Sequence, residues 1–186
     1  MRAMRDEERT VAHWIDEGDA SMRAGRYADA QRAYQAAWPL SKGAMEPVDR
    51  VWLLLSIAHA SIAAGDFEEA FEACAGAQNG FASTGVVAGN PLFHLLAGLA
   101  SHGLGESHER VIDHFARALI CGGPDIFKNE DPRHLEHLRT ILQPPSETGT
   151  WDGYEGCSRD LLNGARGYLA ELLTERLGQP PPYSYP

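Results

Sequence analysis

The sequence predicts an all-α protein built from repeated helical hairpins, and three observations support that fold class. Alanine, the best helix former, is concentrated early, with 24 of the 26 alanines in residues 1–120. Apolar residues in that region recur at helical spacing rather than in the alternation typical of strands. A glycine-centred pattern also recurs every 40 residues, at Gly25, Gly65 and Gly105. A repeat of this length is typical of stacked helical units.

The composition excludes several classes of protein. The chain has 186 residues, three cysteines and a formal net charge of −10. Such acidity disfavours binding to nucleic acid or to an anionic membrane. No run of 18 apolar residues predicts a membrane span, and three scattered cysteines do not make a disulfide scaffold. Residues 1–9 hold three bases and three acids without an apolar stretch, so we expect a cytoplasmic protein.

Each repeated glycine is predicted to end one helix and reverse the chain, because glycine tolerates a positive φ. Small residues then follow where the two helices of a hairpin cross, and Tyr34 and Phe115 are expected to fill the gap toward the next unit. The three units align as Gly25, Tyr27, Ala30, Tyr34, Ala37; Gly65, Phe67, Ala70, Cys74, Ala77; and Gly105, Val111, Phe115, Ala118, the last after a one-residue slip.

Helix starts and loops follow from proline and glycine. Asn90-Pro91 and Asp131-Pro132 each pair an N-cap residue with a proline at the first helical position, and Glu46-Pro47 is a weaker version. We expect loops at 39–49 and 79–91, where Gly, Pro, Ser and Asn accumulate. Past residue 120, a short helix is expected at 132–142 and a long amphipathic helix at 158–177, followed by a proline-rich disordered tail at 179–186.

Residues 10–120 resemble the tetratricopeptide repeat (TPR) family. The first unit matches the family spacing at seven positions, Trp14, Gly18, Gly25, Tyr27, Ala30, Tyr34 and Ala37. The departure is the period, which is 40 residues here and about 34 in the family. The resemblance implies a TPR-like α-solenoid of three hairpins in 1–120, with 121–178 as a helical C-terminal cap on the last hairpin.

A second resemblance concerns the stretch from Pro124 to Trp151, with Asp131-Pro132 and Pro144-Pro145 inside it. It is similar to a signature of uncharacterised bacterial TPR-containing proteins, some of which sit beside toxins. That similarity implies a bacterial immunity or accessory protein that binds a toxin or effector. A general cytosolic adaptor or a secretion-type chaperone is the alternative. The oligomeric state is left open.

In TPR domains the first helices of the hairpins line a concave groove that contacts partner proteins. The resemblance therefore implies a largely apolar partner-binding groove in this chain. Such a surface needs a cover, which is either a partner or the chain's own C-terminal segment. The implied lining residues are Ile15, Asp19, Met22, Arg23, Trp52, Leu55, His59, Ile62, Leu92, Leu95, Leu99 and His102.

Catalytic chemistry finds little support in the sequence. Neither a phosphate-binding glycine loop nor a nucleophile elbow occurs. His134 and His137 share one face of a predicted helix, but a third ligand at a defined spacing is missing. We therefore expect no enzyme activity, no cofactor and no metal, and a metal-dependent enzyme is the least favoured alternative.

Overall fold

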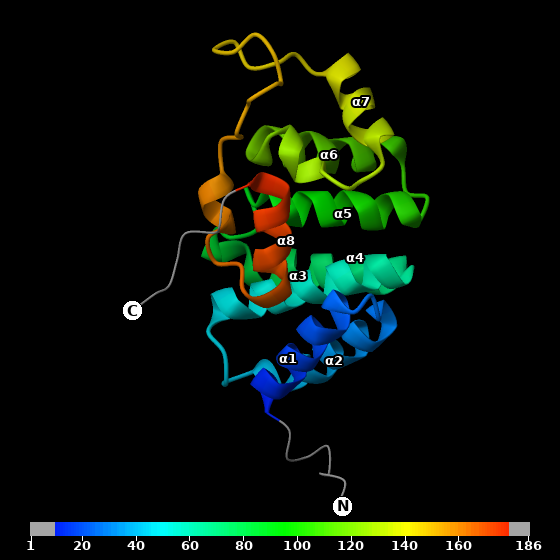
Figure 1. Cartoon of the computed structure of the whole chain (residues 1–186), viewed down its shortest axis with the longest axis vertical. Helices are drawn as coiled ribbons and strands as arrows, with labels where there is room; N and C mark the ends of the chain where they lie inside the picture. The colour runs from blue at the N-terminus through cyan, green and yellow to red at the C-terminus, as the bar shows by residue number, and fades with distance from the viewer. Residues whose placement is uncertain (1–9, 179–186) are drawn as a thin grey trace, which may run out of the picture.

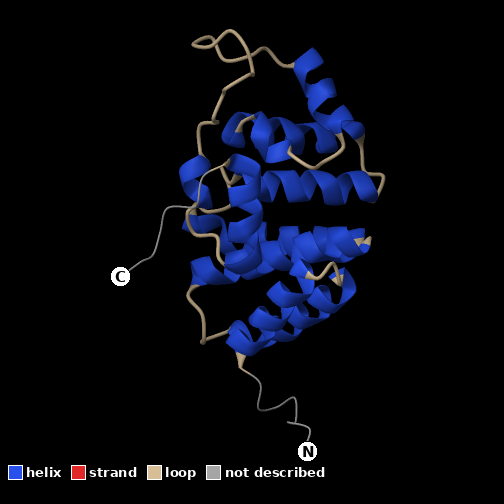
Figure 2. Cartoon of the chain, in the orientation of Figure 1, coloured by secondary structure: helices blue, strands red, loops and turns tan. Residues whose placement is uncertain are grey.

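The structure is a computed structural model that describes residues 10–178, and every regular element in that range is helical (Figure 2). The predicted all-α class is confirmed for this range. The predicted tail at 179–186 lies outside the described residues, as do residues 1–9. The α-helices are α1 (Val11–Arg23), α2 (Tyr27–Ser41), α3 (Pro47–Ala64), α4 (Phe67–Phe81), α5 (Pro91–Gly103), α6 (His108–Gly122), α7 (Pro132–Ile141) and α8 (Gly167–Leu177), and the 3-10 helices are η2 (Ala82–Thr84), η3 (Pro124–Phe127) and η4 (Arg159–Leu162).

Consecutive helices lie against each other, α1 with α2, α3 with α4 and α5 with α6, and Figure 1 shows them following one another along the long axis. The turns inside these pairs contain Gly25, Gly65 and Gly105 at φ values of 69°, 80° and 69°. The predicted positive φ is therefore confirmed at all three glycines. The alanines at the helix crossings, Ala30 and Ala70, are fully buried.

Each of the two large aromatic residues packs on a glycine of its own helix pair, and Phe115 also contacts the rings of Phe127 and His134 in the segment that follows, at 5.8 and 4.6 Å between centroids. The Tyr34 ring lies on Gly18, where an added Cβ would overlap it. Phe115 lies on Gly98 in the same way. Glycine on the first helix therefore gives the ring of the second helix its space, and the two backbones approach closely.

Helix starts follow the predicted capping chemistry in part. The Asn90 side chain accepts hydrogen bonds from the backbone N–H groups of Leu92 and Phe93, and Asp131 accepts from that of Arg133. Glu46 makes no side-chain cap. The loops are shorter than predicted because α2 continues through Pro39 to Ser41 and α4 continues to Phe81.

The predicted continuous helix at 158–177 is wrong. The chain forms η4, breaks across residues 163–166, and starts α8 only at Gly167. Gly167 has φ +55°, a conformation that interrupts a right-handed helix. The predicted helix at 132–142 is observed as α7, with Leu138 fully buried. Within the described range, none of the helices combines the length and apolar character needed to cross a bilayer.

Candidate functional site

The residues predicted to line the groove lie on α1, α3 and α5, and most of them are enclosed. Asp19, Met22, Trp52, Leu55, Leu92 and Leu95 are buried. Ile15, His59, Ile62 and Leu99 are half-buried, whereas Arg23 and His102 are exposed. What encloses this face is a part of the same chain, residues 158–177, which we call the C-terminal cover.

The C-terminal cover contacts α1, α3 and the start of α5. Figure 1 shows α8 crossing in front of α3. The Tyr168 ring stacks on the ring of His59, with centroids 5.8 Å apart. Gly164 lies against the indole nitrogen of Trp52 so closely that a Cβ would overlap it. At the far end, the Asn90 side chain donates a hydrogen bond of 3.4 Å to the carbonyl oxygen of Leu161.

Asp19 of α1 caps the start of α8. Its carboxylate accepts a hydrogen bond of 2.6 Å from the Tyr34 hydroxyl and another from the backbone N–H of Tyr168. The preceding residue, Arg166, supplies no side-chain cap of its own. Burial raises the pKa of Asp19, and these hydrogen bonds oppose that rise. A predicted partner-contacting residue therefore anchors the chain's own helix.

Ionic contacts fix both ends of α8. Near its start, the Arg23 guanidinium donates to both carboxylate oxygens of Glu171. Near its end, Arg176 is 6% exposed, donates to the carbonyl oxygen of Ile126 at 2.6 Å and pairs with Glu130 at 2.5 Å. A buried guanidinium needs such partners because desolvation of an unpaired charge is very costly. The C-terminal cover therefore packs on the α1 and α3 residues that were predicted to line the groove.

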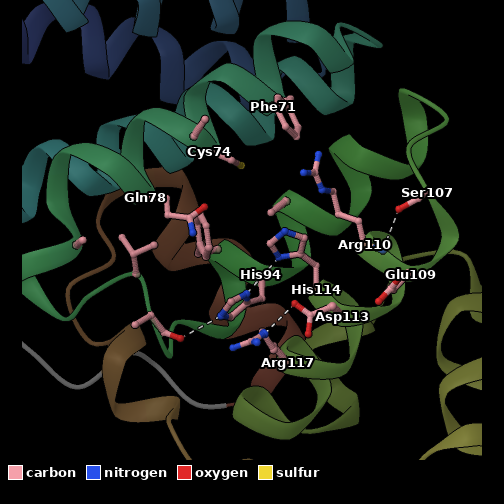
Figure 3. Close-up of a pocket in the computed structure, with 16 residues that line it drawn as sticks. Phe71, Cys74, Gln78, His94, Ser107, Glu109, Arg110, Asp113, His114 and Arg117 are labelled. Carbon is pink, nitrogen blue, oxygen red and sulfur yellow. Dashed lines mark hydrogen bonds and ion pairs between the residues drawn. The ribbon is translucent and has the colours of Figure 1, made fainter.

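A second concave feature is open to solvent (Figure 3). It is a cavity of about 720 Å³ between α4, α5 and α6. Phe71 and Gln78 line it from α4, His94 from α5, and Arg110 and Arg117 from α6. Apolar and polar residues line it in equal number, and its acidic and guanidinium side chains all come from α6. We call this feature the α4–α6 pocket.

Two histidines meet in the α4–α6 pocket, with their Nδ1 atoms 3.3 Å apart. The Nε2 of His94 lies 3.1 Å from the carbonyl oxygen of Ala88, which only accepts, so this nitrogen carries the hydrogen. Burial lowers the pKa of His94 to about 4, and the neutral ring therefore accepts at Nδ1 from the Nδ1–H of His114. This tautomer leaves Nε2 of His114 as a hydrogen-bond acceptor.

The ion pairs at the mouth of the pocket are exposed. Arg110 pairs with Glu106 at 3.1 Å, and Arg117 pairs with Asp113 at 2.9 Å. Each pair joins residues four apart on or next to α6, a kind of contact that contributes only about 0.3–0.5 kcal/mol. Both guanidinium groups can therefore exchange their partners at little cost.

Sequence reasoning did not find the α4–α6 pocket. The sequence predicts His114 only as an exposed or hydrogen-bonded histidine and does not identify His94 as its neighbour. A usable signal did exist, because the two residues lie 20 positions apart on antiparallel helices joined by the Gly105 turn. Placing both on one hairpin would have predicted that they face each other.

The two histidines singled out for metal binding contact different neighbours. His134 lies against His102, with ring centroids 5.0 Å apart, and His137 lies against His108 at 5.3 Å. Among residues 10–178 no three His, Cys, Asp or Glu side chains are grouped closely enough to hold a metal ion. Comparison with known proteins gives no match, whether to a protein-family model, a curated protein or a solved structure.

Proposed function

We propose that this chain is a non-catalytic protein-binding module made of three TPR-like hairpins, with residues 121–178 as a helical C-terminal cap. The support is the combination of stacked consecutive helix pairs, glycine turns 40 residues apart and close crossings at small residues. A solenoid of such hairpins presents extended surfaces to other proteins. The fold and its extended surfaces together favour a protein-binding role over a catalytic one.

The α4–α6 pocket is the surface that we assign to the partner, and its openness beside the filled groove is the observation that carries this proposal. An apolar side chain of a partner would enter between Phe71 and Phe93 on the pocket wall. Arg110 and Arg117 would then re-pair with acidic groups of that partner. A buried aromatic or aliphatic anchor within a charged rim is the usual arrangement of a protein interface.

The biological role that fits this module best is that of a cytoplasmic bacterial immunity or accessory protein, which binds a toxin or effector stoichiometrically. A general adaptor or secretion-type chaperone would use the same surface. A metal-dependent enzyme finds less support, because no three His, Cys, Asp or Glu side chains within residues 10–178 are grouped as metal ligands. A toxin-binding role further requires that the partner be harmful when it is expressed alone.

The test is native mass spectrometry of the affinity-tagged chain recovered from its own cells. We expect an intact one-to-one complex, and we expect the Ala75→Arg variant, which fills the α4–α6 pocket, to lose it. Ala28→Arg, at an exposed position on α2, is the matched control. The recovered companion should arrest growth when expressed alone and not when expressed with this chain.

Three results would refute parts of this proposal. A complex that survives Ala75→Arg places the interface elsewhere. Recovery of the chain without a stoichiometric companion, at near-native expression, refutes the binding function itself. A companion that is harmless alone leaves the adaptor role and removes the immunity role.

A further inference from the structure

Two of the three cysteines lie side by side although 36 residues separate them. Cys121 is in the last turn of α6, and Cys157 lies just before η4, where the C-terminal cover begins. The thiol of Cys157 is close enough to that of Cys121 to help raise its pKa. The backbones are paired as well: Cys157 N–H donates to Ile120 at 3.1 Å, and Ser158 N–H donates to Cys121 at 3.0 Å.

The approach of the two segments is built into the sequence. Gly156 has φ +82°, and an added Cβ would overlap the carbonyl group of Cys121. The Tyr154 hydroxyl donates to the carbonyl oxygen of Ile120 at 2.7 Å, and Arg159 donates to that of Gly122 at 2.8 Å. These contacts hold the segment on the end of α6. The thiols therefore need no large backbone movement to react with each other.

The three cysteines differ in their chemical environment. Cys157 is exposed and Cys121 is half-buried. Burial raises the pKa of the Cys121 thiol, as does the neighbouring Cys157. Cys74 lies on the wall of the α4–α6 pocket with 4% of its surface exposed, and burial raises its pKa to about 12. An oxidant in solution therefore meets Cys157 first and finds Cys121 as the adjacent second thiol, whereas Cys74 reacts slowest because its thiol stays protonated at neutral pH.

We propose that Cys121 and Cys157 form a reversible disulfide when the protein meets hydrogen peroxide. The Cys157 thiolate attacks one peroxide oxygen, the O–O bond breaks, and the released hydroxide takes a proton to become water, which leaves a sulfenic acid. The Cys121 thiolate then attacks the Cys157 sulfur, the S–O bond breaks, and a second hydroxide leaves and is protonated. Two thiols and one peroxide thus give one disulfide and two waters, and a dithiol reductant reverses the link.

The disulfide would change how the groove is closed. It links Cys157, the residue just before the C-terminal cover, to α6. It also closes a loop that contains η3 and α7. Cross-linking restricts the states in which the cover is detached, since the start of the cover can no longer leave α6. Oxidation therefore locks the groove shut, and reduction leaves closure to the non-covalent contacts. This inference does not depend on the proposed partner.

The test uses the full chain, reduced, desalted and treated with a small excess of hydrogen peroxide. We expect the intact mass to fall by about 2 Da, the loss of two hydrogens. The number of thiols that react with maleimide after unfolding should fall from three to one. Peptide mapping should find Cys121 joined to Cys157, and dithiothreitol should restore the starting mass. In Cys121→Ser and Cys157→Ser, no intramolecular link should form.

Three outcomes would overturn the proposal: three reactive thiols after treatment, stepwise oxygen addition at Cys157 without a cross-link, or a disulfide between two molecules. The effect on the groove has its own measurement, hydrogen exchange of the α8 backbone in the oxidised and reduced chain. We expect at least tenfold slower exchange in the oxidised form. Equal exchange would refute the lock while leaving the disulfide in place.

Discussion

Trp52→Ala tests whether the C-terminal cover is an integral part of the fold. Trp52 lies on α3 among the predicted groove residues, and its side chain is 5% exposed. Gly164 of the cover packs directly on its indole nitrogen. If the groove were open, truncating the indole would remove a solvent-facing surface and leave the fold nearly as stable. Because the indole is enclosed, truncation should instead leave a cavity.

The expected cost follows from the size of that cavity. Replacement of a buried tryptophan by alanine costs about 3–5 kcal/mol in unfolding free energy. Domains are stable by only about 5–15 kcal/mol, so this is a large share of the total. At about 2–4 °C per kcal/mol for a chain of this size, the Tm should fall by roughly 6–20 °C.

Trp52→Phe is the matched variant, and urea unfolding followed by circular dichroism is the assay. Within the described residues the indole nitrogen of Trp52 has no hydrogen-bond partner, so phenylalanine loses volume but no hydrogen bond. We expect it to cost about 1–2 kcal/mol. A second probe is Gly164→Val, which should push the cover off the indole and expose it to solvent. Unchanged unfolding midpoints for Trp52→Ala and Gly164→Val together would show that the cover does not pack on the groove.

Three further predictions concern pH, packing and capping. Burial lowers the pKa values of His59 and His94 to about 4 from 6.5, so the folding stability that depends on their neutral rings is complete above pH 6.5 and is lost as the pH falls toward 4. Urea unfolding midpoints measured across that pH range should reveal a loss of at most about 3 kcal/mol per histidine. Midpoints that do not change with pH would refute the burial of the two rings. Gly18→Ala should cost roughly 1–3 kcal/mol by thermal unfolding, because its Cβ overlaps an aromatic ring, whereas Gly80→Ala, with open space, should be neutral or stabilising. Asp19→Ala should cost about 1–2 kcal/mol and speed hydrogen exchange at the start of α8, and unchanged exchange would contradict the capping role.

Local features of the fold could be predicted from the sequence. Turns at Gly25, Gly65 and Gly105 depend on a backbone conformation that few other residues adopt, so the residue type itself carries the information. The start of α5 at Pro91 is equally local, because Asn90 caps the helix that follows it within three residues. Such signals need no knowledge of the rest of the chain.

Features that depend on distant contacts could not be predicted. The periodicity of residues 158–177 favours one helix, and the break before Gly167 becomes understandable only when Asp19 is placed at the start of α8. The backbone pairing that brings Cys157 to Cys121 spans 36 residues and leaves no mark in the spacing of either segment. The sequence left open which segment covers the groove. An apolar face indicates that something covers it, but it does not identify the covering segment.

The Asp19 cap also limits what could replace the C-terminal cover. The start of α8 has no side-chain cap from its own segment, and the carboxylate of Asp19 is buried. Each would be unfavourable alone, and in this fold the carboxylate accepts a hydrogen bond from the start of the helix. A partner segment that displaced the cover would leave Asp19 buried without its backbone donor unless it brought a helix N-terminus to the same place. It would also have to replace the stacking of Tyr168 on His59 and the pairing of Glu171 with Arg23. The groove is therefore matched to its own cover, and this match is the physical reason for assigning the partner to the α4–α6 pocket.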